Sequence, residues 1–155
     1  MQRHGQHSTK GSYGTWALTL AVNFVVMYLV MYTMIATLDH FYLNLGNVYM
    51  TAMMVAPMAL VMLVSMRSMF PSPGANALVA IAAVAIFLLA FYGMRSQALI
   101  GDEQFLRSMI PHHSGAILMC ERSALTDPEI RALCDTIVQS QREEIAQMRS
   151  LLERR

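Results

Sequence analysis

The sequence predicts an all-α integral membrane protein with three transmembrane helices followed by an exported two-helix hairpin. Three apolar segments of membrane-spanning length fill the first part of the chain. Charged residues make up only 14% of the sequence, and most of them follow Arg95. In the second part, apolar residues recur at helical spacing on both sides of one short turn. We therefore expect an N-terminal tail at 1–15, a transmembrane region at 16–95 and a hairpin domain at 96–155.

The transmembrane helices are predicted from segments that contain very few charges and approach the roughly 20 residues needed to cross a bilayer. We place them at about 16–38, 48–66 and 76–94. The Pro-Ser-Pro-Gly stretch at 71–74 is a turn signal between the second and the third. The first segment is too long for the core of a signal peptide and no small-residue cleavage site follows it, so we expect it to be retained.

Lysine and arginine residues near the ends of the spans predict the orientation, because cytoplasmic loops carry more of them. Arg3 and Lys10 precede the first span, and Arg67 lies in the second connection. These residues favour a cytoplasmic N-terminus and a periplasmic C-terminal domain in the inner membrane of a bacterium, whereas Arg95 favours the opposite. Lipid is the expected partner, and a net charge of +1 gives no argument for nucleic acid.

The hairpin is predicted to contain one helix at about 102–125 and a second that ends near Glu153. Pro111 lies inside the first helix and predicts a bend or a loosened turn. The short connection between the helices makes them antiparallel neighbours.

Two start signals precede the second helix of the hairpin. Thr126 with Glu129 matches a capping box, and Asp127 followed by Pro128 matches an N-cap before a proline in the first turn. Both signals predict that the second helix begins within this stretch.

The first helix of the hairpin carries a series of metal-ligand types. Since a helix advances about 100° per residue, one stripe collects Met109, His112, His113, Ala116 and Cys120, with Met119 at its margin. Thioether, imidazole and thiol donors suit copper or another late transition metal better than magnesium or calcium. Two purely structural histidines are the alternative interpretation.

The facing helix has a polar interruption at the same level. If Cys120 lies opposite Cys134, antiparallel pairing places His113 opposite Gln141 and Asp102 opposite Leu152. The predicted metal ligands are Met109, His112, His113, Met119, Cys120, Glu144 and Met148. Gln141 and Asp102 are expected to support them through hydrogen bonds.

The two cysteines, Cys120 and Cys134, can form either a disulfide or a metal–thiolate site in an exported domain, and both alternatives stay open. Asp39 and His40 follow the first span on the same side of the membrane as the hairpin. They can cap a helix or, with Cys134, belong to a second group of candidate ligands. His4 and His7 are expected in a solvated tail.

The hairpin contains a set of short motifs in a fixed order: Met-Ile-Pro-His-His at 109–113, Gly-Ala-Ile at 115–117, Met119, Pro-Glu at 128–129, then Gln141, Glu144, Ile145 and Met148, with Asp102 and Phe105 ahead of them. In these residues the region at about 101–152 resembles the bacterial family catalogued as domain of unknown function 305. The resemblance implies a ferritin-like fold of helical hairpins and, from some exported members, copper binding and copper tolerance.

Four positions depart from the family pattern. Ser114 stands where Gln is common, Leu118 where an acidic residue is common, and Cys120 and Cys134 where small residues are common. The missing acid argues against a carboxylate-rich site, and the added thiols favour a soft site or a disulfide.

The expected function is a membrane-anchored envelope protein that binds copper, as Cu(I), for sequestration, tolerance or handover to copper-handling envelope proteins, with zinc or iron as the alternative metals. A single hairpin of about 50 residues cannot bury much core, so we expect a homo-oligomer that completes a four-helix bundle. A ferritin-like redox enzyme and a structural or sensory protein are the competing functions. The hairpin lacks a Glu-x-x-His motif, which argues against di-iron chemistry.

Methionine is abundant in the apolar part, where ten of the 15 methionines lie between Met27 and Met69. Met50, Met54, Met58, Met62 and Met66 recur at intervals of four. Thioethers can bind Cu(I), but methionine also packs well between helices, and packing is the favoured interpretation.

Overall fold

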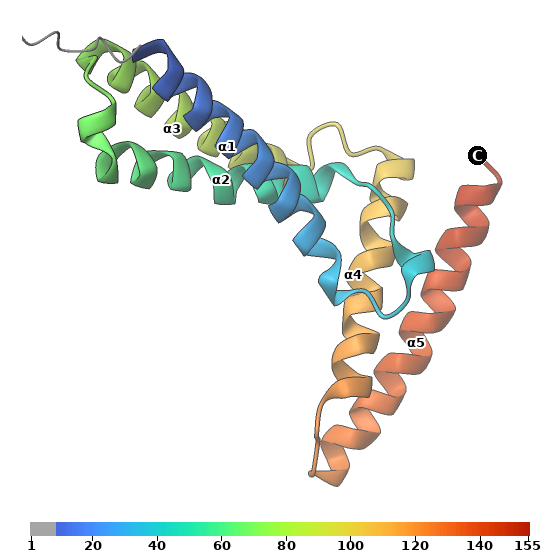
Figure 1. The fold of residues 1–155 in the computed structure, drawn as a ribbon. Helices are drawn as coiled ribbons and strands as arrows, with labels where there is room; N and C mark the ends of the chain where they lie inside the picture. The colour runs from blue at the N-terminus through green and yellow to red at the C-terminus, as the bar shows by residue number, and fades with distance from the viewer. Residues whose placement is uncertain (1–8) are drawn as a thin grey trace, which may run out of the picture. The chain divides into compact units, whose positions relative to one another are not determined.

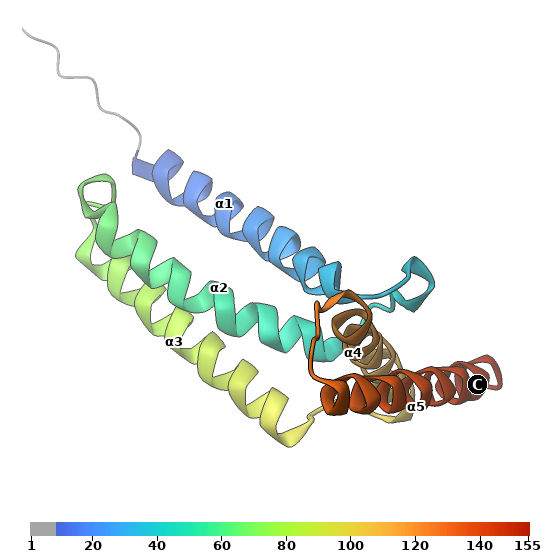
Figure 2. The ribbon, with the colours of Figure 1, turned by 90° about the horizontal axis from the view of Figure 1, so that it is seen from below.

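A computed structural model describes residues 9–155 of the chain, and this part is all-α. It divides into two compact units. The first contains residues 9–28 and 49–96, and the second contains Leu29–Val48 and Gln97–Arg155. We call them the apolar unit and the hairpin unit, and their helices are shown in Figures 1 and 2.

Three helices build the apolar unit: α1 (Thr9–Val30), α2 (Leu45–Ser65) and α3 (Pro73–Ser96). The end of α1 and the start of α2 belong to the hairpin unit. The stretches Tyr13–Met34, Leu45–Ser65 and Pro73–Ser96 are long and apolar enough to cross a membrane. The three predicted spans are therefore confirmed as helices of suitable length and composition. The first apolar stretch ends at Met34, about four residues before the predicted end, because the backbone becomes extended at Ile35.

Two side-chain hydrogen bonds join helices of the apolar unit. The Tyr13 hydroxyl donates to Asn76 Oδ1 at 2.8 Å, and the Asn23 amide donates to Met58 Sδ at 2.7 Å. A Cβ on Gly93 would lie 2.9 Å from the Tyr49 ring, so a larger residue here would displace that ring. Small residues of this kind let neighbouring helices approach closely. The hydrogen bond from Asn23 gives the thioether of Met58 a structural role.

The hairpin consists of α4 (Asp102–Arg122) and α5 (Pro128–Glu153), which lie side by side in opposite directions (Figure 1). Asp127 Oδ1 accepts the backbone N–H of Glu129 at 2.8 Å and of Ile130 at 3.3 Å. Asp127 is therefore the N-cap, and the capping box at Thr126 is not used. Helix α4 continues unbroken through Pro111.

The connection between α1 and α2 packs against α4. It contains two 3₁₀ turns, η1 (Met31–Met34) and η2 (Leu38–His40), and both contact α4. A Cβ on Gly115 would lie 3.4 Å from the Met34 carbonyl oxygen, at van der Waals contact, so the connection packs directly on this position of α4. One face of the hairpin is therefore covered by its own chain.

Candidate metal site on the hairpin

The α4 residues that face α5 recur at intervals of four, three and four. They are Leu106, Ile110, His113 and Ile117, and all are buried. The three apolar members form the hydrophobic core with Ile145 and Met148 of α5. Such spacing is typical of helices that pack along a common seam. His113 is the polar member of this inward stripe.

His113 is held by hydrogen bonds at both ring nitrogens. Its Nδ1–H donates to the Met109 carbonyl oxygen at 2.9 Å. Its Nε2 lies 2.6 Å from Glu144 Oε2. The other oxygen of Glu144 accepts a hydrogen bond from the Ser140 hydroxyl at 2.8 Å. The backbone of α4 thus orients the ring, and Ser140 orients the carboxylate that faces it.

The charge on Glu144 decides what can lie between these two groups. The Ser140 hydroxyl, and then His113, lower the pKa of Glu144 below its ordinary value, so the carboxylate is ionised near neutral pH. An ionised carboxylate can only accept hydrogen bonds, and a carbonyl oxygen also only accepts. With Nδ1 bonded to the Met109 carbonyl, a proton fills the 2.6 Å between Nε2 and Oε2. A metal cation, whose bonds to nitrogen and oxygen are about 2.0 Å long, would replace that proton as the two side chains move apart.

The predicted ligand stripe is divided between two faces of α4. His113 is buried, whereas His112 is exposed, and their ring centroids are 6.1 Å apart at an interplanar angle of 65°. Met109 is half-buried and packs against the core, and Met119 is 58% exposed. The two histidines therefore do not project from α4 in the same direction.

The two cysteines form a disulfide between α4 and α5. Of the two alternatives that the sequence left open for Cys120 and Cys134, the structure contains the covalent bond. Neither sulfur is a thiolate in this oxidised state, so neither can serve there as a thiolate ligand.

The other residues predicted to bind or support the metal have different partners. Met148 is buried in the core, and Asp102 pairs with Arg155 at 2.8 Å. His113 meets Glu144, whereas the predicted pairing placed it opposite Gln141, about one helical turn away. Helical side chains lean toward the N-terminus of their own helix, so long side chains of antiparallel helices meet at a level displaced from that of their backbones.

Across the part of the chain that the structure describes, no three His, Cys, Asp or Glu side chains come together as a ready-made metal site. The structure unites His113 and Glu144 from the predicted ligand set. His4 and His7 lie outside the described residues. One copy of the hairpin would therefore offer a metal ion two of the predicted ligands, His113 and Glu144.

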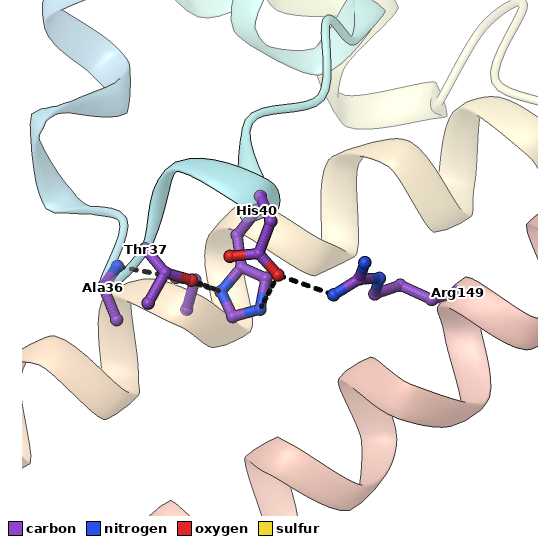
Figure 3. Close-up of polar contacts among 6 residues, drawn as sticks. Ala36, Thr37, His40 and Arg149 are labelled. Atoms are coloured by element: carbon purple, nitrogen blue, oxygen red, sulfur yellow. Dashed lines mark hydrogen bonds and ion pairs between the residues drawn. The ribbon is translucent and has the colours of Figure 1, made fainter.

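A second polar cluster forms on the covered face of α4 (Figure 3). Ser114 Oγ is fully buried; it accepts the backbone N–H of Ala36 at 2.7 Å and lies 2.8 Å from His40 Nδ1. The Thr37 hydroxyl lies 3.2 Å from the same nitrogen. Since burial lowers the pKa of His40, the ring is neutral and Nδ1 accepts from the Ser114 hydroxyl.

Asp39 completes this cluster. Its Oδ2 lies 3.8 Å from His40 Nε2 and 2.6 Å from Arg149 Nη1 of α5. The Thr37 hydroxyl, followed by His40 and Arg149, lowers the pKa of Asp39 below its ordinary value. Arg149 already occupies the carboxylate oxygen that a cation would need. Asp39 and His40 therefore fit a structural role better than that of metal ligands.

Serine, histidine and aspartate meet in this cluster, as they do in hydrolase triads. Ser114 has no exposed surface, and its oxygen already accepts the Ala36 N–H. A nucleophile must be reachable by its substrate, so Ser114 is not suited to attack one. The cluster joins the connection to the hairpin.

Sequence reasoning missed Ser140, Ser114 and Arg149. Ser140 precedes Glu144 by four residues, a spacing at which helical side chains meet, so its bond to the carboxylate could have been anticipated. Ser114 and Arg149 contact residues more than 70 positions away, and no local spacing indicates such contacts.

The comparisons with known proteins agree with the resemblance seen in the sequence. The family model described as "Domain of unknown function (DUF305)" matches residues 94–152. "Uncharacterized protein L153" of Acanthamoeba polyphaga mimivirus is 36% identical over 115 residues, which are 73% of this chain and 74% of that protein. A match of this length extends beyond the hairpin into the apolar helices. No solved structure matches the chain. The chain belongs to the DUF305 family.

Proposed function

We propose that this DUF305 protein is a membrane-anchored metal-binding protein that holds copper on its hairpin, at the His113–Glu144 pair. The observation that carries the proposal is the orientation of His113. Metal-binding histidines usually donate their second ring N–H to a carbonyl or a carboxylate, which fixes the other nitrogen toward the metal. His113 Nδ1 makes such a bond to the Met109 carbonyl, and Nε2 points at an ionised carboxylate.

The donor types around this pair support copper. Imidazole and carboxylate groups bind copper more tightly than other divalent first-row metals, and thioethers favour Cu(I). Met109 lies one turn before His113, and Met148 lies one turn after Glu144. Since Cys120 is in a disulfide, the preference for Cu(I) depends on these thioethers. Zinc and iron are the competing ions.

The disulfide supports placement of the hairpin on the outer side of the membrane. Disulfides persist in oxidising compartments and are rare in the cytoplasm. An anchor of three membrane-spanning helices with a cytoplasmic N-terminus would put the C-terminal hairpin on that side. The protein would then sequester copper at the membrane surface or hand it to other envelope proteins.

The test is the metal content of the full chain purified in detergent after copper and zinc are offered together. We expect copper to be retained by the wild type and lost by the double variant His112→Ala/His113→Ala. The matched control, His4→Ala/His7→Ala, removes the same number of imidazoles from the tail and should retain copper. Undiminished copper in the His112/His113 variant would overturn the proposal. Oxygen consumption with a reducing substrate, measured on the loaded protein, would instead indicate a redox enzyme.

A further inference from the structure

One face of the hairpin is largely apolar, and its side chains are exposed or half-buried. On α4 it is formed by five residues at intervals of four, three, four and three: Phe105, Met109, His112, Ala116 and Met119. On α5 it is formed by Ile130, Leu133, Ile137, Ser140 and Glu144 at intervals of three, four, three and four. Leu133 is 58% exposed, as Met119 is. We call these ten residues the open face.

Both halves of the open face lie on the same side of the hairpin. Each of its α4 residues directly precedes an inward-facing residue, and Glu144 likewise precedes the buried Ile145. In two antiparallel helices, the residues that directly precede the inward-facing residues lie on one side of the pair. The residues that directly follow the inward-facing residues lie on the other side. Ser114 and Arg149 each follow an inward residue, and both contact the 31–45 connection. The open face is thus the one opposite the covered face.

The composition of the open face favours a second copy of this chain as its occupant. Among its ten residues, the ionisable ones are His112 and Glu144, and none is lysine or arginine. A helix that lies on a membrane surface usually carries basic residues beside its apolar stripe. The spacing of three and four residues is also compatible with packing on other helices. Two hairpins joined through this face would complete a four-helix bundle.

The candidate metal pair lies on the same face. Glu144 belongs to it, and His113 Nε2 is bonded to Glu144 from the adjacent inward stripe. His112 lies at the centre of the α4 half and is exposed. Within the described residues of one copy, His113 and Glu144 lack a third His, Cys, Asp or Glu ligand. A twofold axis that crosses the open face at the level of His112 would bring His112 of each copy to the level of the other copy's pair.

We propose that two copies pair through their open faces and share the metal site, with His112 of one copy binding the cation held by His113 and Glu144 of the other. This inference rests on the proposed function, because it completes the same site. It also gives the exposed His112 a role that it cannot have as a side chain of the hairpin core.

Complementation between two variants tests the shared site. Full chains carrying His112→Ala and Glu144→Gln are expressed together with different affinity tags, and mixed dimers are isolated in detergent by both tags. Each variant alone should lose copper. The mixed dimer has one intact shared site, so it should retain about half of the wild-type copper. Sites confined to single chains would leave the mixed dimer as empty as its parents, which would overturn the inference.

Two further results separate this inference from the proposed function. Full copper retention by His112→Ala with loss in His113→Ala would keep the His113–Glu144 site and overturn the shared one. Retention by both variants would overturn the proposed function itself.

The pairing surface is tested without metal. Light scattering with a corrected micelle mass should show a dimer for the wild type and a monomer for Leu133→Lys. The matched control, Thr136→Lys, places the same charge on an exposed position outside the open face and should stay dimeric. A monomeric wild type, with the face left to lipid or to another protein, would overturn the inference.

Discussion

Two histidines, His40 against the covered face of the hairpin and His113 beside the open face, are prepared for different tasks. On the covered face, His40 accepts a hydrogen bond from the buried Ser114, and burial keeps its ring neutral. On the open side, the ring of His113 faces the ionised carboxylate of Glu144. Adjacent positions in α4, 113 and 114, supply these two environments.

The difference follows from what each histidine meets. Ser114 offers a neutral hydroxyl to His40, so that ring closes a network that holds the connection on α4. Glu144 offers a negative charge to His113, so that pair attracts a proton or a cation. We therefore expect changes on the covered face to alter stability with little effect on metal, and changes on the open face to do the reverse.

The largest expected effect concerns the disulfide, which supports both faces. Replacing both Cys120 and Cys134 by serine should lower the stability of the hairpin by about 3 kcal/mol, since the bond closes a loop with a sequence separation of 14. Hydrogen exchange of the α4 and α5 amides in detergent measures the loss. Copper retention should persist while the hairpin stays folded. A folded variant that loses copper would instead show that a cysteine is a ligand.

The sequence predicted the helices well because apolar segments, Pro128 and the cap at Asp127 are local signals. The division of the ligand stripe between two faces was not predicted, since a wide stripe drawn from 100° steps cannot show which residues meet α5. The contact of His113 with Glu144 was missed by about one turn, because pairing of backbone positions ignores the lean of helical side chains toward the N-terminus of their own helix. The covered face depends on contacts between distant segments, and spacing carries no sign of them.

The next effect tests the covered face. Ser114→Ala removes the acceptor of the Ala36 N–H and the donor to His40, and an unsatisfied buried group costs about 1–3 kcal/mol. The 31–45 connection should lose hydrogen-exchange protection by that amount, while copper affinity stays unchanged. Ser123→Ala is the matched control, because that exposed hydroxyl bonds only within its own turn of helix. Equal effects of the two variants would remove Ser114 from the stabilising cluster.

A comparable effect on binding tests the open face. Glu144→Gln keeps the shape of the side chain and removes its charge, so copper should bind roughly 10 to 100-fold more weakly by competition titration. Gln141→Ala should have a smaller effect, since the ring of His113 is bonded to Glu144. The stability of the hairpin should change little. Glu143→Gln is the control on the neighbouring exposed position, and an equal loss of affinity there would count against a specific site.

The smallest effect is the response of the covered face to acid. Burial lowers the pKa of His40 below its ordinary value of 6.5, so the stabilising effect of the neutral ring is complete above about pH 6.5 and declines as the pH falls toward the lower folded value. Protonation places a hydrogen on the nitrogen that accepts from Ser114, and the new charge is repelled by Arg149. Asp39, whose pKa is also lowered, stays ionised over this range and continues to hold Arg149, so the loss should be partial. Hydrogen exchange of the 31–45 amides, corrected for its intrinsic pH dependence, should therefore show weaker protection at pH 5.5 than at pH 7.5. His40→Gln has no proton to gain and should make protection independent of pH in this range. A wild-type connection that is equally protected at both values would mean that the ring does not titrate within the folded cluster.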